Sequence, residues 1–211
     1  MEYAASDRWD VGEAIAQGWK RFWPNILPMA LFAVVVWGVS FLLQLLQPDE
    51  AGAFAAFVVN ALRFLVGQLI AIGWIALALD ITDGRPISAD RIVSRFRVIV
   101  PYLIAAVLFS LMVSVGLVLL IVPGIIVILV FGFYGFHIVD TGQTNPIAAL
   151  SRSMELTRGH RLQLLLLGLL LVLINIVGVL LLIVGVLFTS GISLLAVAYV
   201  YRQLSPVRSL S

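Results

Sequence analysis

Long apolar stretches separated by short polar segments dominate the pattern of this chain. A membrane-spanning helix needs roughly 20 mostly apolar residues. Four stretches reach that length, at residues 25–46, 54–79, 102–139 and 162–200. The last two are long enough for two crossings each, so the pattern predicts six transmembrane helices in an all-α protein.

A Pro123-Gly124 pair lies in the middle of residues 102–139, which contain no Asp, Glu, Lys or Arg. One helix over this whole stretch would be roughly 57 Å long and would overshoot a bilayer. Proline ends helices, and glycine accepts the unusual backbone angles of a tight turn. The pair therefore predicts that the chain reverses there, with a further reversal near Gly185.

Composition agrees with this pattern, because 62% of the 211 residues are hydrophobic and 11% are charged. Soluble domains average about 25% charged residues. The first ten residues are polar and acidic, so we expect no cleaved signal peptide. The chain has no cysteine, which excludes disulfides and thiolate metal sites. We predict one membrane domain over residues 1–211.

The basic residues are distributed unevenly between the predicted connections. With six spans, every lysine and arginine except Arg63 falls on one side of the membrane. The opposite connections, at residues 47–53 and at the two predicted turns, contain none. By the positive-inside rule, both termini are predicted to be cytoplasmic.

The polar connectors contain an internal repeat. With a shift of 60 positions, Asp80 aligns with Asp140 and Pro86 with Pro146, without a gap. The segment "DVGEAIAQGWKRFW" has apolar residues at helical spacing and resembles the same plan more loosely. We predict three units, each an interfacial amphipathic helix followed by a transmembrane hairpin. Their ranges are 10–79, 80–139 and 140–204.

Helix-end signals accompany these amphipathic segments. Asp10 is a candidate N-cap with Glu13 at the third helical position. Asn145 is a candidate cap followed by Pro146 in the first turn, and Gly159 is expected to end that helix.

The segments "WKRFWPN", "LLIVPGI", "HIVDTGQTNPIAALSRSMELTRGHR" and "AYVYRQL" together resemble a known family. They are similar to the membrane domain of bacterial glycerophosphodiester phosphodiesterases and to related YciC-type integral membrane proteins. The resemblance implies the plasma (inner) membrane of a bacterium. The phosphodiesterase activity of that family belongs to a separate soluble barrel, so the resemblance implies no enzyme here.

Arg63 is the one charged residue in the interior of a predicted span. Counting from Phe54, it lies roughly 14 Å from the outer boundary, near the midplane. Burying it unpaired costs at least ~2.5 to 3.5 kcal/mol. Asn60 lies one turn outward and Gln68 more than a turn inward on the same helix, and Asn175 is expected at a depth comparable to that of Arg63. These four residues form a candidate ligand-binding site for an anion or lipid headgroup, and the alternative is that Arg63 snorkels or ties helices together.

His137 and Asp140 are spaced i, i+3 at the predicted cytoplasmic end of the fourth span. They are candidates for a hydrogen-bonded helix-end pair, and capping of the following helix is the alternative. Two such residues do not make a metal site, and no cofactor or metal is predicted.

Basic residues recur near the start of the odd-numbered spans. Lipid phosphates attract such side chains by about 1 kcal/mol each, and topology and anchoring are the simpler interpretation. Nucleic-acid binding is not expected, because the bases are scattered and accompanied by acids. The candidate headgroup contacts are Lys20, Arg21, Arg95, Arg97, Arg158 and Arg161.

These patterns predict a non-enzymatic integral membrane protein that interacts with lipids, anionic lipids included, or organises a membrane complex. No catalytic constellation is present in the sequence. A small transporter or channel with a polar midplane site around Arg63 is one alternative. An accessory subunit of a larger membrane complex, through a membrane-protein partner or self-association, is another.

Overall fold

The computed structural model describes residues 9–45, 52–180 and 182–205, and this part of the chain is helical without a strand. Three short helices begin the predicted units. These are α1 (Val11–Phe22), α4 (Ala89–Ser94) and α8 (Pro146–Leu156). Each is followed by two or three further helices. They are α2 (Ile26–Leu45) with α3 (Ala53–Thr82), α5 (Ile99–Leu119) with α6 (Ile121–Phe131) and α7 (Tyr134–Thr141), and α9 (Arg161–Leu180) with α10 (Leu182–Leu204).

Five of the described helical stretches are long and apolar enough to cross a membrane. They are Val11–Leu45, Ala53–Thr82, Ala89–Leu119, Ile121–Thr141 and Arg161–Leu180. The first and third include a short 3-10 segment, Trp23–Asn25 (η1) and Arg95–Val98 (η2). The all-α class and membrane character are therefore confirmed. The sixth span and the internal repeat stay predictions, although the order of one short helix and two or three further helices occurs three times.

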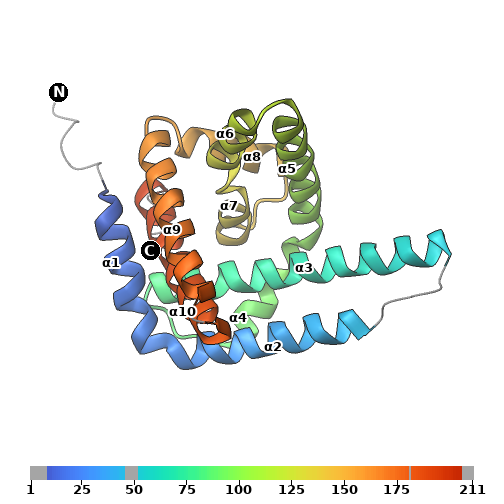
Figure 1. Cartoon of the computed structure of the whole chain (residues 1–211), viewed down its shortest axis with the longest axis horizontal. Helices are drawn as coiled ribbons and strands as arrows, with labels where there is room; N and C mark the ends of the chain where they lie inside the picture. Colours follow the sequence, from blue (N-terminus) through green and yellow to red (C-terminus); the bar gives the residue numbers. More distant parts are fainter. Residues whose placement is uncertain (1–8, 46–51, 181, 206–211) are drawn as a thin grey trace.

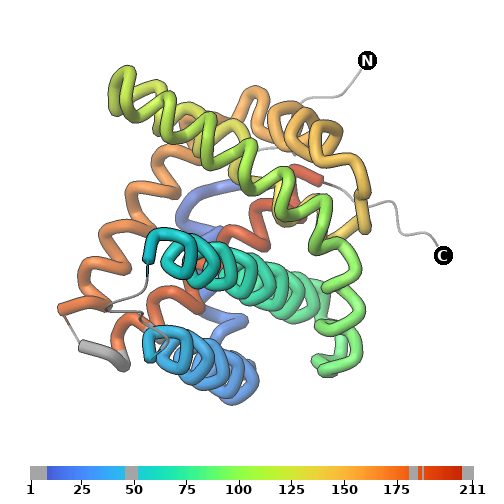
Figure 2. Tube along the Cα trace, turned by 90° about the vertical axis from the view of Figure 1, so that its right-hand side faces the viewer, coloured from blue at the N-terminus to red at the C-terminus, as the bar shows by residue number. Residues whose placement is uncertain are grey.

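The three hairpins diverge from a shared centre (Figure 1). Seen from the side in Figure 2, the end of α2, the start of α3, the turn between α5 and α6 and the end of α9 all lie toward the left. Helices α4 and α8 lie toward the other side. The hairpins therefore point the same way while spreading apart from each other.

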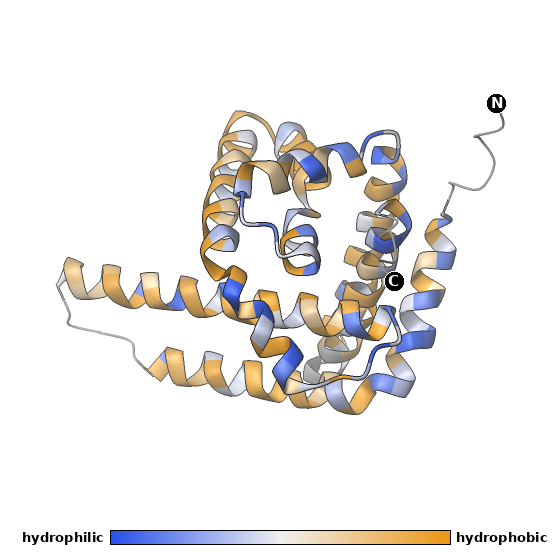
Figure 3. Ribbon diagram, turned by 180° about the vertical axis from the view of Figure 1, so that it is seen from behind, coloured by the Kyte–Doolittle hydropathy of each residue, from blue (hydrophilic) through white to orange (hydrophobic). Residues whose placement is uncertain are grey.

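The core lies where the hairpins meet. It contains the second half of α3, from Ile72 to Ile81, together with α7, α8 and the second half of α10. By contrast, large apolar side chains are exposed along the hairpin arms, such as Leu31 (59%) on α2 and Val118 (86%) on α5. Figure 3 shows these arms as mostly hydrophobic ribbon. Exposed apolar surface on this scale is what a lipid-facing helix presents.

Helix α1 packs lengthwise on α10, a contact that the sequence did not predict, and its interfacial position stays a prediction. Its buried positions Ala14, Gly18 and Phe22 recur at helical spacing. A side chain at Gly18 would come within 2.6 Å of the Ile192 carbonyl oxygen, and Phe22 contacts Gly191. Because the apolar face of α1 is covered by α10, the first and last described helices are packed together.

The reversal between α5 and α6 falls at Leu120 rather than at Pro123-Gly124. Leu120 has extended angles (φ −167°, ψ 152°), and α6 begins at the next residue. Pro123 therefore lies in the first turn of α6, where its missing N–H breaks no helical hydrogen bond. Gly124 is helical and packs against Gly116, where a side chain would come within 2.9 Å of backbone. The glycine serves close helix contact, not the turn.

Other helix-end predictions have mixed outcomes. Asn145 caps α8 as expected, accepting from the backbone N–H groups of Ile147 (3.0 Å) and Ala148 (3.2 Å), with Pro146 next. Asp10 occupies the N-cap of α1 without a side-chain cap bond.

Gly159 was predicted to end a helix and Gly185 to mark a reversal of the chain, and only Gly159 lies as predicted. Gly159 has a left-handed φ of +87° and follows α8 as predicted. Gly185, however, is helical within α10, and the reversal between α9 and α10 comes before it. Most of the predicted connection 47–53 lies outside the described residues.

Candidate functional site

Carboxylates stand at the C-terminal ends of two helices in the core. Asp80 lies in the last turn of α3 and Asp83 directly follows that helix, while Asp140 lies in the last turn of α7. Gly84 (φ +66°) and Gly142 (φ +71°) end the two helices in the left-handed conformation. A helix C-terminus carries partial negative charge, so carboxylates there need cations nearby.

Arg202, in the last turn of α10, supplies that cation to both helices. Its guanidinium donates to both oxygens of Asp83, at 2.7 Å each. It also donates to both oxygens of Asp140, at 2.6 and 2.7 Å. The three side chains are 14%, 16% and 7% exposed. One arginine therefore holds two nearly buried carboxylates in fork geometry, the strongest form of ion pairing available to it.

Two more residues complete this cluster. The Tyr201 hydroxyl donates to Asp140 (3.1 Å), and its fully buried ring packs against Phe136. Arg95, following α4, pairs with the buried Asp80 (3.4 Å) and donates to the Val139 carbonyl oxygen (3.0 Å) near the end of α7. We call Asp80, Asp83, Asp140, Arg95, Tyr201 and Arg202 the charged cluster.

The charged cluster joins one helix from each hairpin, α3, α7 and α10. Its three carboxylates face Arg95 and Arg202 inside and the more exposed Arg85, which pairs with Asp83 at 3.4 Å. The formal charges balance. No grouping of three or more potential metal ligands occurs in the described part of the chain. This arrangement ties helices together and offers no reactive group.

His137 and Asp140 do not form the predicted pair. Asp140 is fully engaged by Arg202 and Tyr201. The Nδ1 atom of His137 is buried without a hydrogen-bond partner, and its backbone carbonyl accepts from Thr141 (2.7 Å). Asp140 does not cap the following helix either, since Asn145 does so. The Asp140 carboxylate pairs instead with Arg202 on α10. From the sequence, Arg202 was used only with the other basic residues, to assign the cytoplasmic side.

The four residues expected around a midplane site are not brought together. Arg63 donates to the Leu43 carbonyl oxygen (3.0 Å) in the α2–α3 hairpin. Asn175 donates instead to Ser193 (2.8 Å) and to the Leu171 carbonyl oxygen (2.7 Å), joining α9 to α10. Asn60 is exposed and Gln68 half-buried on α3. Arg63 and Asn175 thus belong to different hairpins and have different partners.

The candidate headgroup residues separate into two groups. Arg95 points inward to the charged cluster, which corrects its assignment to lipid contact. Arg21 is half-buried with its guanidinium over the Tyr199 ring (5.2 Å). The others remain exposed and available to a membrane surface. They are Lys20, Arg97, Arg158 and Arg161.

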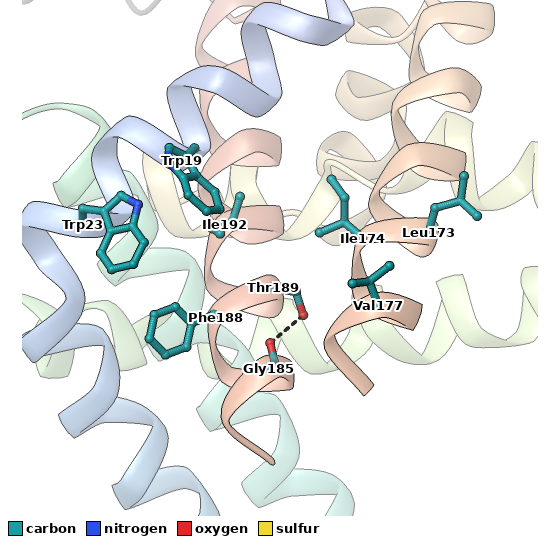
Figure 4. A pocket seen from close by; sticks show the side chains of 9 residues that line it. All are labelled: Trp19, Trp23, Leu173, Ile174, Val177, Gly185, Phe188, Thr189 and Ile192. Carbon is teal, nitrogen blue, oxygen red and sulfur yellow. Dashed lines mark hydrogen bonds between the residues drawn. The ribbon is translucent and has the colours of Figure 1, made fainter. Parts of the chain in front are cut away.

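An apolar cleft of about 620 Å³ lies between α1, α9 and α10 (Figure 4). Trp19 and Trp23 form one wall, and Leu173, Ile174 and Val177 of α9 form the other. Its remaining lining residues come from α10. They are Gly185, Phe188, Thr189 and Ile192.

The cleft offers few polar groups to a ligand. The Thr189 hydroxyl already donates within its own helix, to the Gly185 carbonyl oxygen at 3.0 Å (Figure 4). Trp19 and Trp23 are 54% and 47% exposed, with ring centroids 5.5 Å apart. The amphipathic pattern of α1 predicted that Trp19 lies on an apolar helix face. The cleft itself depends on the docking of α1 on α10, which sequence reasoning missed.

Fold and site together define a helical membrane protein with a charged helix junction and an apolar cleft. Residues 92–208, more than half of the chain, match a domain of unknown function, DUF7847. The chain belongs to that family. No curated protein matches it. No solved structure matches it either. The resemblance to the phosphodiesterase membrane domains stays a prediction.

Proposed function

We propose that this protein is a non-enzymatic, lipid-interacting integral membrane protein that holds a phospholipid acyl chain in the cleft between α1, α9 and α10. The apolar cleft of about 620 Å³ carries the proposal. Its walls are apolar side chains, and its one hydroxyl is already bonded within the helix. A polar metabolite would lose its hydration there without gaining partners, whereas an acyl chain would not.

The entrance of the cleft supports a lipid over another apolar ligand. Tryptophan favours the boundary between hydrocarbon and headgroups, because its ring is apolar and its N–H is polar. Trp19 and Trp23 line the cleft, and the exposed Lys20 lies beside Trp19 in α1. A lysine near the membrane surface attracts anionic headgroups by about 1 kcal/mol. The proposal therefore includes a preference for anionic phospholipid.

Selectivity for a bound chain has to come from shape. Acyl chains in a bilayer already have apolar surroundings, so their transfer into the cleft brings no hydrophobic gain. Close packing against Trp19, Trp23 and Phe188 supplies dispersion contacts instead. We place the protein in the bacterial inner membrane with six spans and cytoplasmic termini, as part of the same proposal.

Filling the cleft tests the proposal. The variant Val177→Phe enlarges a lining side chain, and Leu169→Phe makes the same kind of change at a 57% exposed position of α9 outside the cleft. We expect Val177→Phe to retain less phospholipid through gentle delipidation, measured by native mass spectrometry, with Leu169→Phe unchanged. Phospholipids brominated along the chain should also quench tryptophan less in Val177→Phe.

The control for the quenching signal is the double variant Trp19→Phe, Trp23→Phe, which identifies the share of fluorescence that reports the cleft. Equal lipid retention and equal quenching in Val177→Phe and the unmodified protein would contradict the proposal. A stoichiometric membrane-protein partner in the preparation would favour the accessory-subunit alternative. The transporter alternative loses support because Arg63 and Asn175 have separate partners.

A further inference from the structure

Arg63 lies in a second hollow, between α2 and α3 and apart from the acyl-chain cleft. The hollow has a volume of about 310 Å³ and is lined by Ser40, Leu43, Gln44, Gly67 and Ile70 together with Arg63. Two of these neighbours, Ser40 and Gln44, carry hydrogen-bonding side chains on α2. An arginine and two polar side chains therefore face one space in an otherwise apolar hairpin.

The guanidinium of Arg63 is only partly satisfied within the protein. One terminal nitrogen donates to the Leu43 carbonyl oxygen at 3.0 Å. The Nε atom is buried and has no hydrogen-bond partner. None of the ion pairs in the described ranges includes Arg63. An arginine has five N–H donors, and a half-buried cation with unused donors favours an anion.

The position of Arg63 along α3 gives its distance from the charged cluster. Counting from Asp83 in the charged cluster, Arg63 lies 20 residues back along the helix, which corresponds to about 30 Å at 1.5 Å per residue. That is the thickness of the hydrocarbon core. Taking Asp83 as the basic boundary puts Arg63 near the opposite boundary, whereas counting from Phe54 puts it near the midplane. The first of these two depths is part of the proposal that follows.

We propose that Arg63, with Ser40 and Gln44, binds a phosphate anion, the phosphodiester of a phospholipid in the leaflet opposite the basic side. A guanidinium matches two phosphate oxygens in fork geometry. The serine hydroxyl and the glutamine amide donate to the remaining oxygens. This site does not rest on the acyl-chain cleft, from which it differs in every lining residue.

The test is binding of phosphatidylglycerol to the purified full chain in detergent micelles, followed by native mass spectrometry. We expect Arg63→Gln to weaken binding at this site about tenfold, the loss of one charge-assisted contact. Arg63→Lys keeps the positive charge but cannot bind two phosphate oxygens in fork geometry. Its binding of phosphatidylglycerol should therefore be intermediate between that of Arg63→Gln and that of the unmodified protein. Phe57→Leu, at a 69% exposed position on the same helix outside the hollow, is the control and should bind as the unmodified protein does.

A second variant and a competition measurement complete the test. If Arg63→Gln fails to fold, Ser40→Ala combined with Gln44→Leu retains the guanidinium and should still weaken phosphatidylglycerol binding. Inorganic phosphate is added as a competitor, and displacement of the lipid by it would overturn the assignment to a phospholipid in favour of soluble phosphate. Unchanged phosphatidylglycerol binding in folded Arg63→Gln would overturn the site altogether.

The acyl-chain cleft and the Arg63 site are tested independently of each other. Val177→Phe should leave Arg63-dependent phosphatidylglycerol binding intact, and Arg63→Gln should leave chain-dependent quenching of Trp19 and Trp23 intact. A loss of both signals in either variant would indicate general unfolding.

Discussion

Arg202 binds two carboxylates that lie 62 and 119 positions away in the sequence. All three side chains are at most 16% exposed, so each has given up most of its hydration. A buried ion pair contributes modestly when complete, because attraction offsets the loss of hydration. Removing one partner is different, since it leaves an uncompensated charge in a region that water does not reach.

Replacing Arg202 with methionine should therefore lower the free energy of unfolding by about 3–5 kcal/mol. Arg85→Met is the matched control, because Arg85 pairs with the same Asp83 but is 46% exposed. An exposed pair contributes about 0–1 kcal/mol. Thermal or chemical unfolding in one detergent measures both variants. A small effect of Arg202→Met, equal to that of Arg85→Met, would show that the charged cluster does not hold the helices together.

Residue-level prediction from the sequence succeeded where the signal was local. Asn145 and Pro146 mark the start of α8 because a cap bonds to N–H groups two and three residues on. The roles of Asp140 and Arg95 could not be found this way, because their partners come from other helices. The predicted grouping of Arg63 with Asn175 in one site failed for the same reason, since similar depth in a bilayer does not determine which helices are neighbours.

Helix α1 and helix α10 form the closest contact between two elements far apart in sequence. Gly18 permits it, because its missing side chain leaves room for the backbone of Ile192 and Ala196. The Glu13 carboxylate accepts from the Tyr199 hydroxyl at 2.8 Å farther along the same contact. Close packing of small residues is a common way for membrane helices to associate. The walls of the acyl-chain cleft depend on this contact.

Gly18→Ala should loosen the contact and destabilise the protein by about 1–3 kcal/mol, the usual cost of overpacking. The added carbon would lie 2.6 Å from the Ile192 carbonyl oxygen, so one helix must move. Gly168→Ala in α9 is the control, since nothing lies within 4 Å of its added carbon. Because alanine favours helix over glycine, that variant should gain up to about 1 kcal/mol. Similar unfolding temperatures for the two variants would contradict close packing at Gly18.

At the scale of elements, apolar periodicity identified the helices but not their contacts. The predicted turn at Pro123-Gly124 was displaced by three residues, because proline is tolerated in the first turn of a helix as well as after its end. The amphipathic pattern of α1 indicated one apolar face correctly. It could not distinguish a face covered by lipid from one covered by α10, since both are apolar surroundings.

The described part of the molecule has the α5–α6 turn and the ends of α2 and α9 toward one side, and the short helices α4 and α8 toward the other (Figure 2). A distribution of basic residues predicts the side that faces the cytoplasm. The sequence therefore indicated the class, and the side that faces the cytoplasm stays a prediction. The way the hairpins spread apart could not be predicted from hydropathy. The hairpin helices are all mostly apolar, so their sequences do not distinguish one direction from another (Figure 3).

Accessibility to a reagent that cannot cross membranes tests this arrangement. The chain has no cysteine, so single substitutions label without background. We expect Asp90→Cys in α4 to react with an impermeant maleimide from the cytoplasmic face of oriented vesicles. Leu120→Cys, at the α5–α6 turn and 69% exposed in the unmodified protein, should react from the opposite face. Reaction of both positions from the same face would contradict the topology.

The position of Arg202 in the last described helix has a consequence for how the protein is made. Chains enter the membrane from the N-terminal end, so Asp83 and Asp140 are synthesised well before their common cation. Until α10 arrives, these carboxylates must stay hydrated at the membrane surface, and α1 has no helix to cover it. Final closure of the bundle therefore waits for α10. A chain interrupted before that helix carries uncompensated acids and an uncovered apolar face, features by which proteases recognise unfinished products.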